Sequence, residues 1–384
     1  MSYRAATIIM KIFLNIFILQ LTGDLKIVAI FSMYALGFHM FGYWGLSYVL
    51  KYGYRNLSYY IALLGTGLLL LSLVFRPEYI GEYYMIYGTI YGIFSGIYWC
   101  VYNNNQFDFT VPKNRGNYEG LKKSIRTGVS IGVPLFIGSL IAINPLGMGY
   151  QFSFLIASLL CFISGVFGRV DETKIQISKS KIQFFKYIKI TQKYPDIWKI
   201  MGINFLISFA LSMPLIEVLF PLILHSDGFN EAKIGFFISL ASVLSIIVSY
   251  IFGKYVAYTH YKKAFALGAI IYIITIFGAI IGNSSVFIYG FIPLAIILYI
   301  IIDIPRSVFI MNILHDIEDY ERYKGEHMLL QEIGIISGRS IVFILLFIVG
   351  VLTHETVFFT FTLMGGAMFL ALILFMNTRH LDKD

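Results

Sequence analysis

Long runs of apolar residues, separated by short polar segments, dominate this chain from end to end. The runs are continuous, and most reach the roughly 20 residues that a helix needs to cross a bilayer. Because lipid offers backbone groups no hydrogen-bonding partner, only helices or closed barrels can cross, and continuous runs favour helices. We predict an all-α membrane protein of twelve transmembrane helices, at residues 6–22, 27–49, 57–75, 83–102, 128–144, 150–168, 200–224, 234–253, 264–282, 285–309, 328–352 and 356–376.

The composition agrees with this pattern and excludes other classes. Of the 384 residues, 58% are hydrophobic and 13% are charged, whereas soluble proteins carry roughly a quarter charged residues. Cys100 and Cys161 both lie in apolar runs, and the histidines lack ligand spacing, so neither a disulfide framework nor a metal site is expected. No phosphate-binding loop and no cluster of acid, base and nucleophile appears. We therefore expect neither an enzyme nor a bound cofactor.

Lysine and arginine are distributed very unevenly among the polar segments. With both termini on the inner side, twenty-three fall in inner segments, and the outer loops hold only Lys26, Arg76 and Lys233. Cytoplasmic loops retain basic residues, so both termini are expected in the cytoplasm of a multi-pass protein of the cytoplasmic membrane. The net charge of +8 then reports topology, and a nucleic-acid partner is not expected. No small-residue cleavage site follows the first run, so we expect a first span rather than a signal peptide.

A long lysine-rich segment divides the chain near its middle. It gives three expected parts: an N-terminal six-helix bundle (1–168), a cytoplasmic linker (169–199) and a C-terminal six-helix bundle (200–384). Its lysines alternate with Ile and Phe, which suits a helix lying on an anionic membrane surface. A solvated tether between the two bundles is the alternative.

Polar residues recur between the halves at an offset of 207 residues. Acidic residues fall on acidic ones, basic on basic and amide on amide: Asp24 on Glu231, Arg55 on Lys262, Asn105 on Asn312, Arg115 on Arg322 and Glu119 on Glu326. With an even number of spans in each half, both halves insert in the same orientation. The pattern predicts a parallel repeat with pseudo-two-fold symmetry about the membrane normal.

Basic residues also mark the inner loops of each half. The loop after the second span contains Lys51, Gly53 and Arg55, its counterpart contains Lys262, and Arg115 and Arg322 each follow a fourth span. Together with the repeat, these features resemble the major facilitator superfamily over essentially the whole chain, without assigning a subfamily. Leu50 stands where that superfamily usually has an acidic residue. The resemblance implies two bundles that alternate access to a central site lined by spans one, four, seven and ten.

Charged residues inside the predicted spans are candidates for the transport pathway, because charges are costly in lipid. Lys11 lies in the first span, with Asn15 one turn further on the same face. It either lines a cavity beside a partner or extends along a short first helix toward water.

The tenth and eleventh spans carry further charges. Asp303 and Arg306 lie on one face around Pro305, as a substrate-binding or gating ion pair or as a structural salt bridge. Arg339 lies deep in the eleventh span and needs a partner, for which Glu332 and Asp303 are candidates.

The seventh and fourth spans each hold a candidate with an interfacial alternative. Glu217 lies between Pro214 and Pro221, which should break the helix, and either carries a proton or reaches outer water. Trp99 and Asn103, one turn apart, either recognise a polar solute or mark the membrane interface.

Glycines repeat every four residues in the fourth span, at Gly88, Gly92 and Gly96. Such a ladder lets two helices approach closely, and we predict a structural role for it.

Our hypothesis is a monomeric secondary active transporter that moves a small solute by alternating access. Proton coupling through Glu217, Asp303 and Glu332 is part of that hypothesis, because all three are embedded acids. The substrate and the direction of transport stay open, and the expected partners are a small molecule, protons and the lipid bilayer. The alternative is a non-transporting membrane scaffold or sensor, which Leu50 and the degenerate motifs would suit.

Overall fold

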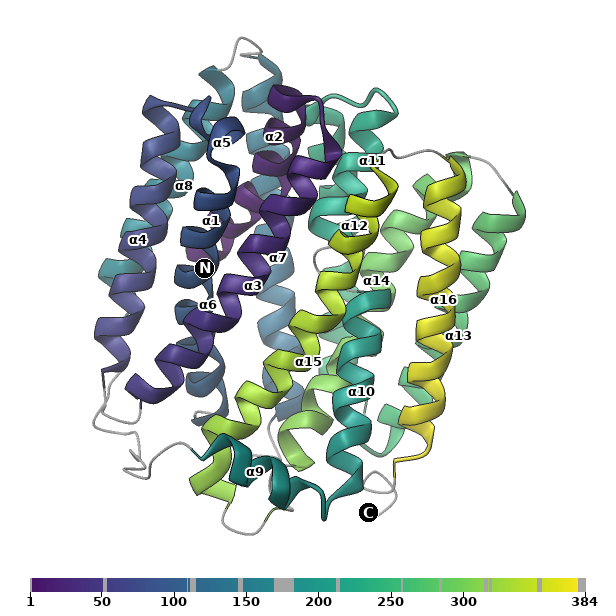
Figure 1. Ribbon diagram of the computed structural model, residues 1–384. Coiled ribbons are helices and arrows are strands. Elements are labelled where there is room, and N and C mark those ends of the chain that lie inside the picture. The colour runs from purple at the N-terminus through teal and green to yellow at the C-terminus, as the bar shows by residue number, and fades with distance from the viewer. Residues whose placement is uncertain are drawn as a thin grey trace.

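The apolar runs form long, roughly parallel helices in the computed structural model (Figure 1). The structure describes residues 2–50, 54–108, 110, 115–143, 148–168, 183–211, 215–256, 258–282, 285–313, 317, 320–350 and 354–378. Among these residues, ten helices are long and apolar enough to cross a bilayer. The predicted all-α membrane fold is confirmed.

The first half begins with one span made of three pieces, because a π-helical turn interrupts the α-helix. Its elements are α1 (Ser2–Ile9), the π-helical turn η1 (Met10–Leu14), α2 (Asn15–Thr22), α3 (Leu25–Leu50), α4 (Arg55–Phe75), α5 (Tyr79–Glu82), α6 (Tyr84–Asp108), α7 (Arg115–Ile143) and α8 (Met148–Phe167).

The second half repeats the interrupted first span. Its elements are α10 (Pro195–Ala210), the π-helical turn η4 (Leu215–Leu219), α11 (Phe220–Ser226), α12 (Glu231–Tyr255), the short 3₁₀ turn η5 (Tyr258–His260), α13 (Tyr261–Gly282), α14 (Ser285–Ile313), α15 (Tyr320–Val349) and α16 (His354–Met376). The helix break predicted around Glu217 is thus present, with α10 ending at Ala210 and η4 beginning at Leu215.

Two further segments run beside the ten apolar helices. Tyrosines and amides lower the hydropathy of α6, which packs against α3 and α4. The interrupted seventh span contributes α10, which packs against α15 and α16. These two segments account for the fourth and seventh of the predicted spans.

Three predicted boundaries differ from the observed helices by six residues or more. Helix α6 continues to Asp108 instead of ending at 102, α7 begins at Arg115 instead of 128, and α15 begins at Tyr320 instead of 328. The extra turns are rich in charged and amide side chains, which hydropathy assigns to loops. In the structure several of these side chains bind one another inside the bundle, so the helices continue.

The glycine ladder of α6 lies against α3. A methyl group built on its three glycines would lie 2.7, 2.4 and 2.1 Å from the backbone oxygens of Phe31, Ala35 and His39. Only glycine allows such an approach, which agrees with the predicted structural role of the ladder.

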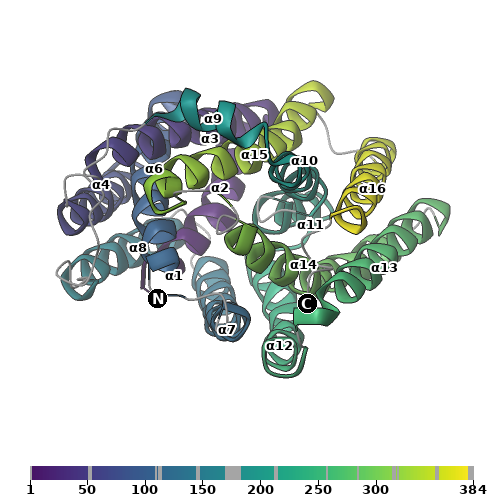
Figure 2. The ribbon, with the colours of Figure 1, turned by 90° about the horizontal axis from the view of Figure 1, so that it is seen from below.

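Two helix pairs join the halves: α7 packs on α12, and α3 packs on α15, on opposite sides of the molecule (Figure 2). A methyl group built on Gly120 of α7 would lie 2.6 Å from the Cα of Gly253 in α12. Next to it, the hydroxyls of Ser124 and Ser249 lie 2.9 Å apart. The bundle boundaries at 168 and 200 stay a prediction.

The linker between the halves contains a helix, α9 (Phe184–Thr191), which lies across one end of the bundle (Figure 1). We call this end the α9 end and the opposite one the α5 end. Tyr187 is fully buried, and its hydroxyl lies 2.6 Å from His327 Nδ1 in α15, whereas Phe185 is 74% exposed. The helix predicted for the linker is therefore present from 184 to 191, and residues 169–182 lie outside the described part.

Candidate functional site

A cavity of about 170 Å³ lies between the two halves. Side chains of η1, α6, α7, α14 and α15 line it, so both halves contribute. It has space for several water molecules, each of which occupies about 30 Å³ in the liquid. Two neighbouring cavities, of about 80 and 60 Å³, share lining residues with it. We call the three together the central cavity system.

Glu217 joins the halves at the place where the two π-helical turns meet. Its carboxylate binds the guanidinium of Arg4, and its Oε2 lies 2.9 Å from Lys11 Nζ. Single-turn π-helices inside α-helices often occur at functional sites, and here η1 carries Lys11 while η4 carries Glu217. Glu217 is buried, which overturns the interpretation of an interfacial glutamate reaching outer water.

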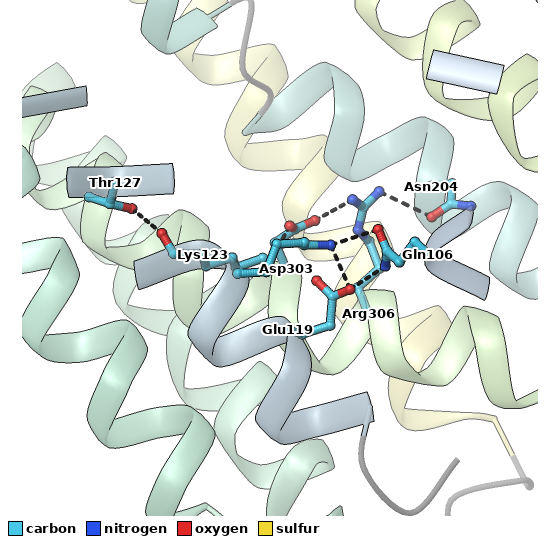
Figure 3. A network of polar contacts seen from close by, with 8 residues as sticks. Gln106, Glu119, Lys123, Thr127, Asn204, Asp303 and Arg306 are labelled. Atoms are coloured by element: carbon cyan, nitrogen blue, oxygen red, sulfur yellow. Dashed lines mark hydrogen bonds and ion pairs between the residues drawn. The ribbon is translucent and has the colours of Figure 1, made fainter. Parts of the chain in front are cut away.

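Asp303 forms a second bridge between the halves (Figure 3). Its carboxylate accepts hydrogen bonds from Lys123 of α7 and from Arg306, one turn further along α14. Arg306 also donates to Asn204 of α10 over 3.2 Å. The predicted Asp303–Arg306 pair is present, and Lys123 extends it into the first half.

Glu332 forms the third bridge. Its Oε1 lies 3.1 Å from His39 Nε2, and His39 Nδ1 lies 3.3 Å from the hydroxyl of Ser95. Both His39 and Glu332 are buried between α3 and α15. The structure therefore gives Glu332 a histidine as its partner, where the sequence had favoured Arg339.

The three bridges share one polarity. Their carboxylates, Glu217, Asp303 and Glu332, all belong to the second half, and the first half supplies a basic partner to each. Ionic and hydrogen-bonded contacts therefore lie at the centre of the interface between the halves, and apolar contacts surround them.

Two arginines line the cavity without such a bridge. Arg126 of α7 places its guanidinium 5.5 Å from the centre of the Trp99 ring, a cation–π geometry. Arg339 of α15 lines both the main cavity and its neighbour. Neither guanidinium has a hydrogen bond or ion pair within the part of the chain that the structure describes.

The remaining predicted site residues are also close to the cavity. Trp99 and Asn103 line it, and the amide of Asn103 donates to the hydroxyl of Tyr43 over 3.4 Å. Asn15 donates to the backbone oxygen of Lys11 over 2.7 Å and lines the neighbouring cavity. The structure thus brings together all nine pathway candidates that the sequence named.

The described residues of the predicted loop motif lie at the α9 end. Arg55 is buried and donates to Asp108 over 2.6 Å and to Asn105 over 2.9 Å, so an acid from α6 serves where Leu50 offers none. Lys324 of the second half binds the same Asp108. Arg322 is exposed beside Tyr323, and Lys262 lies in the first turn of α13. Lys51, Gly53 and the side chain of Arg115 lie outside the described residues.

Four basic residues of the site escaped the sequence reasoning. Arg4, Lys123 and Arg126 were counted with the inner loops, and His39 was one of several scattered histidines. The role of each depends on the docking of the other half, which the sequence does not show. One signal was present in the sequence: Lys123 and Arg126 lie three residues apart in α7 and therefore share a helix face.

Metal ligation is a separate question, since carboxylates and a histidine lie near the cavity. The described residues contain no group of three or more His, Cys, Asp or Glu side chains that could hold a metal ion.

Comparisons with known proteins agree with this architecture. Among curated protein sequences, none matches the chain. The solved structures that share the fold at low identity include the human organic anion transporter MFSD10 (TETRAN), at 12% identity over 97% of this chain and 96% of that one, with a TM-score of 0.70. They also include a bacterial homologue of the iron transporter ferroportin, at 16% identity. Its outward-facing structure with soaked iron covers 100% of this chain and 97% of that one, with a TM-score of 0.65, and its inward-facing structure covers 98% and 95%, with a TM-score of 0.62. The family model of the Major Facilitator Superfamily matches residues 3–319. The chain is a multi-pass membrane protein that belongs to the Major Facilitator Superfamily of transporters.

Proposed function

We propose that this protein carries a small solute across the cytoplasmic membrane by alternating access between its two bundles. The observation that carries the proposal is the set of three bridges between oppositely charged faces of the halves, around a cavity to which both halves contribute. Ionic and hydrogen-bonded contacts can exchange partners or water when bundles separate, whereas a purely apolar interface would have to expose its core.

Contacts near the two ends of the bundle support the same mechanism. At the α5 end, Glu231 of α12 accepts hydrogen bonds from Gln20 over 2.6 Å and from Tyr150 over 2.8 Å. At the α9 end, Lys324 binds Asp108 across the halves. Alternating access requires each set to open while the other stays closed.

The distribution of basic residues supports a cytoplasmic position for the α9 end. In Figure 1 the N-terminal end of the chain lies at mid-height of the bundle and not at the α9 end, which differs from the cytoplasmic N-terminus predicted from the sequence. A membrane-impermeant thiol reagent applied to intact cells should label Lys233→Cys at the α5 end and leave Tyr255→Cys at the α9 end unlabelled. Both side chains are exposed, and both native cysteines are buried. The reverse labelling would contradict this orientation.

For proton coupling, the geometry favours Glu332 over the other two acids. Glu217 and Asp303 each contact two basic groups, so protonating either would remove the carboxylate charge that both of those groups share. Among the described residues Glu332 bonds one histidine, and both members of that pair can bind a proton. We propose that the His39–Glu332 pair takes up the proton that drives the cycle.

Distances between spin labels test alternating access without knowledge of the substrate. One labelled pair, Glu78→Cys with Lys233→Cys, spans the halves at the α5 end, and a second, Tyr54→Cys with Tyr255→Cys, spans them at the α9 end. A carrier in nanodiscs should show two distance populations at each end that change in opposite senses. One fixed distance at both ends would instead favour the scaffold alternative.

The same labels test the proton site. Between about pH 5.5 and about pH 8, the distance populations of the wild-type background should shift. His39→Gln and Glu332→Gln should abolish that shift, and Glu355→Gln, at an exposed acid, should not. Populations that do not depend on pH in the wild-type background would remove proton coupling from the proposal.

A further inference from the structure

The central cavity system has an excess of positive charge. Seven lysine and arginine side chains and one histidine, but only four acidic side chains, line it among the described residues. Each acid already has a basic partner: Glu217, Asp303 and Glu332 in the bridges between the halves, and Glu119 through Lys122 over 2.6 Å. Arg126 and Arg339 are the cations left over.

These two arginines come from different halves and face one cavity. The Nε atom of each is buried and has no hydrogen-bond partner in the described chain. Each guanidinium therefore faces the cavity with donors that no anionic side chain binds, and the planar donors of arginine suit a carboxylate or similar oxyanion. An anion bound between them would complete the charge balance of the site and join the two halves.

The surroundings of the two arginines also indicate what the rest of the ligand looks like. The neighbouring cavity of about 80 Å³ shares Lys11, Trp99 and Arg339 with the main one. Beyond these shared residues its walls are mostly apolar, formed by Met10, Leu14, Phe31, Leu36, Val218 and Phe343. A charged head at the shared residues would therefore have an apolar space beside it.

We propose that the transported solute is an organic anion with an apolar body, whose oxyanion head binds between Arg126 and Arg339. The proposal rests on the transport function proposed above and names its substrate class. A cation is the less suited ligand, because it would meet the unpaired arginines and find every lining carboxylate already occupied.

A matched set of probes tests this class on the purified protein. The probes are 4-phenylbutyrate, the neutral 4-phenylbutanol and the cationic 4-phenylbutylamine, which share one body, together with butyrate and inorganic phosphate. A ligand that binds the folded state raises its thermal stability by mass action, so titration of the melting temperature in detergent gives an affinity. We expect 4-phenylbutyrate to bind at least about tenfold more tightly than each of the others, which corresponds to about 1.4 kcal/mol.

Variants assign the effect to the two arginines. Arg126→Ala and Arg339→Ala should each weaken 4-phenylbutyrate binding at least tenfold, a difference of about 1.4 kcal/mol. Lys254→Ala, at an exposed lysine of α12, should leave binding unchanged. Where an alanine variant does not fold, the corresponding lysine variant keeps the charge but loses the bidentate geometry, and it should bind with intermediate affinity.

Three results would overturn the proposal. If the amine or the alcohol bound as tightly as 4-phenylbutyrate or more tightly, an anionic head would be excluded. If phosphate or butyrate bound as tightly as 4-phenylbutyrate, the apolar body would be excluded. If both arginine variants bound 4-phenylbutyrate with full affinity, this site would be excluded. The spin-label experiment uses no ligand. Two exchanging distance populations combined with any of these results would therefore refute the substrate class alone, and a single fixed distance would refute the transport function itself.

Discussion

Removing the charge of Glu217 should destabilise the folded protein strongly, because this carboxylate holds two cations of the other half. Glu217 is buried, and its Oε2 lies 2.9 Å from Lys11 Nζ. At an effective dielectric constant of 20, two unit charges at that distance attract by about 6 kcal/mol, part of which offsets their desolvation. Removing one partner from a buried pair typically costs about 3–5 kcal/mol, and we expect Glu217→Gln to lower the free energy of unfolding by that amount.

A double-mutant cycle separates the ion pair from other effects of the substitution. Lys11→Met alone should cost less than Glu217→Gln, because Glu217 keeps Arg4 as a partner. In the variant with both changes, neither charge of the Lys11–Glu217 pair remains. The free-energy cost of the double substitution should therefore be about 1–3 kcal/mol smaller than the sum of the two single costs, as expected for residues in contact.

Reversible unfolding in mixed detergent micelles, followed by tryptophan fluorescence, measures these free energies. Glu355→Gln, at an exposed acid, serves as the control and should change stability by no more than about 0.5 kcal/mol. If the cost of the double substitution equalled the sum of the costs of Lys11→Met and Glu217→Gln to within about 0.5 kcal/mol, the two charges would not interact. The Lys11–Glu217 bridge would then contribute nothing to stability.

Two more predictions concern packing and the linker helix. A methyl group on Gly96 would lie 2.1 Å from the backbone oxygen of His39, so Gly96→Ala should lower the free energy of unfolding by about 1–3 kcal/mol. Gly37 has open space around it, so Gly37→Ala should have little effect. Equal effects of the two substitutions would refute the close contact at Gly96. Tyr187→Phe removes the hydrogen bond to His327 and should lower the free energy of unfolding by about 1–3 kcal/mol in the same assay. The segment before α9 should also be digested faster by a protease. An unchanged digestion rate would show that this bond does not hold the linker.

The fold could be predicted from the sequence because lipid imposes one strict rule on the backbone. Any apolar run long enough to cross the bilayer must be helical. The apolar runs then give the number of helices, and the basic segments give their orientation in the membrane. The rule fails where a helix carries polar side chains that face protein. The first turns of α7, which hold Glu119, Lys122 and Lys123, appear polar in the sequence and are helical in the structure. Glu119 is fully buried there, because Gln106 and Lys122 donate to it.

Individual site residues could be predicted, but their partners could not. Charges such as Lys11, Glu217 and Arg339 are conspicuous in apolar runs and need no structure to be noticed. Their pairing depends on how two bundles dock, since Arg4 and Glu217 are separated by 213 positions in the chain. The prediction for Arg339 shows the difference, because its nearest candidate in the sequence, Glu332, binds His39 instead.

The docked arrangement also changes the meaning of the three embedded acids. In the sequence they look alike, as carboxylates in apolar spans, and the natural hypothesis is that all three carry protons. In the structure, Glu217 and Asp303 each balance two cations, which is sufficient reason for an acid to be buried there. Glu332 is different because its bonded partner among the described residues is one histidine, His39, which can itself bind a proton. Protonating this pair changes the charge between α3 and α15 without removing a carboxylate charge that two cations share. Counting charges on both sides of the interface thus narrows the hypothesis of proton coupling from three candidate acids to one.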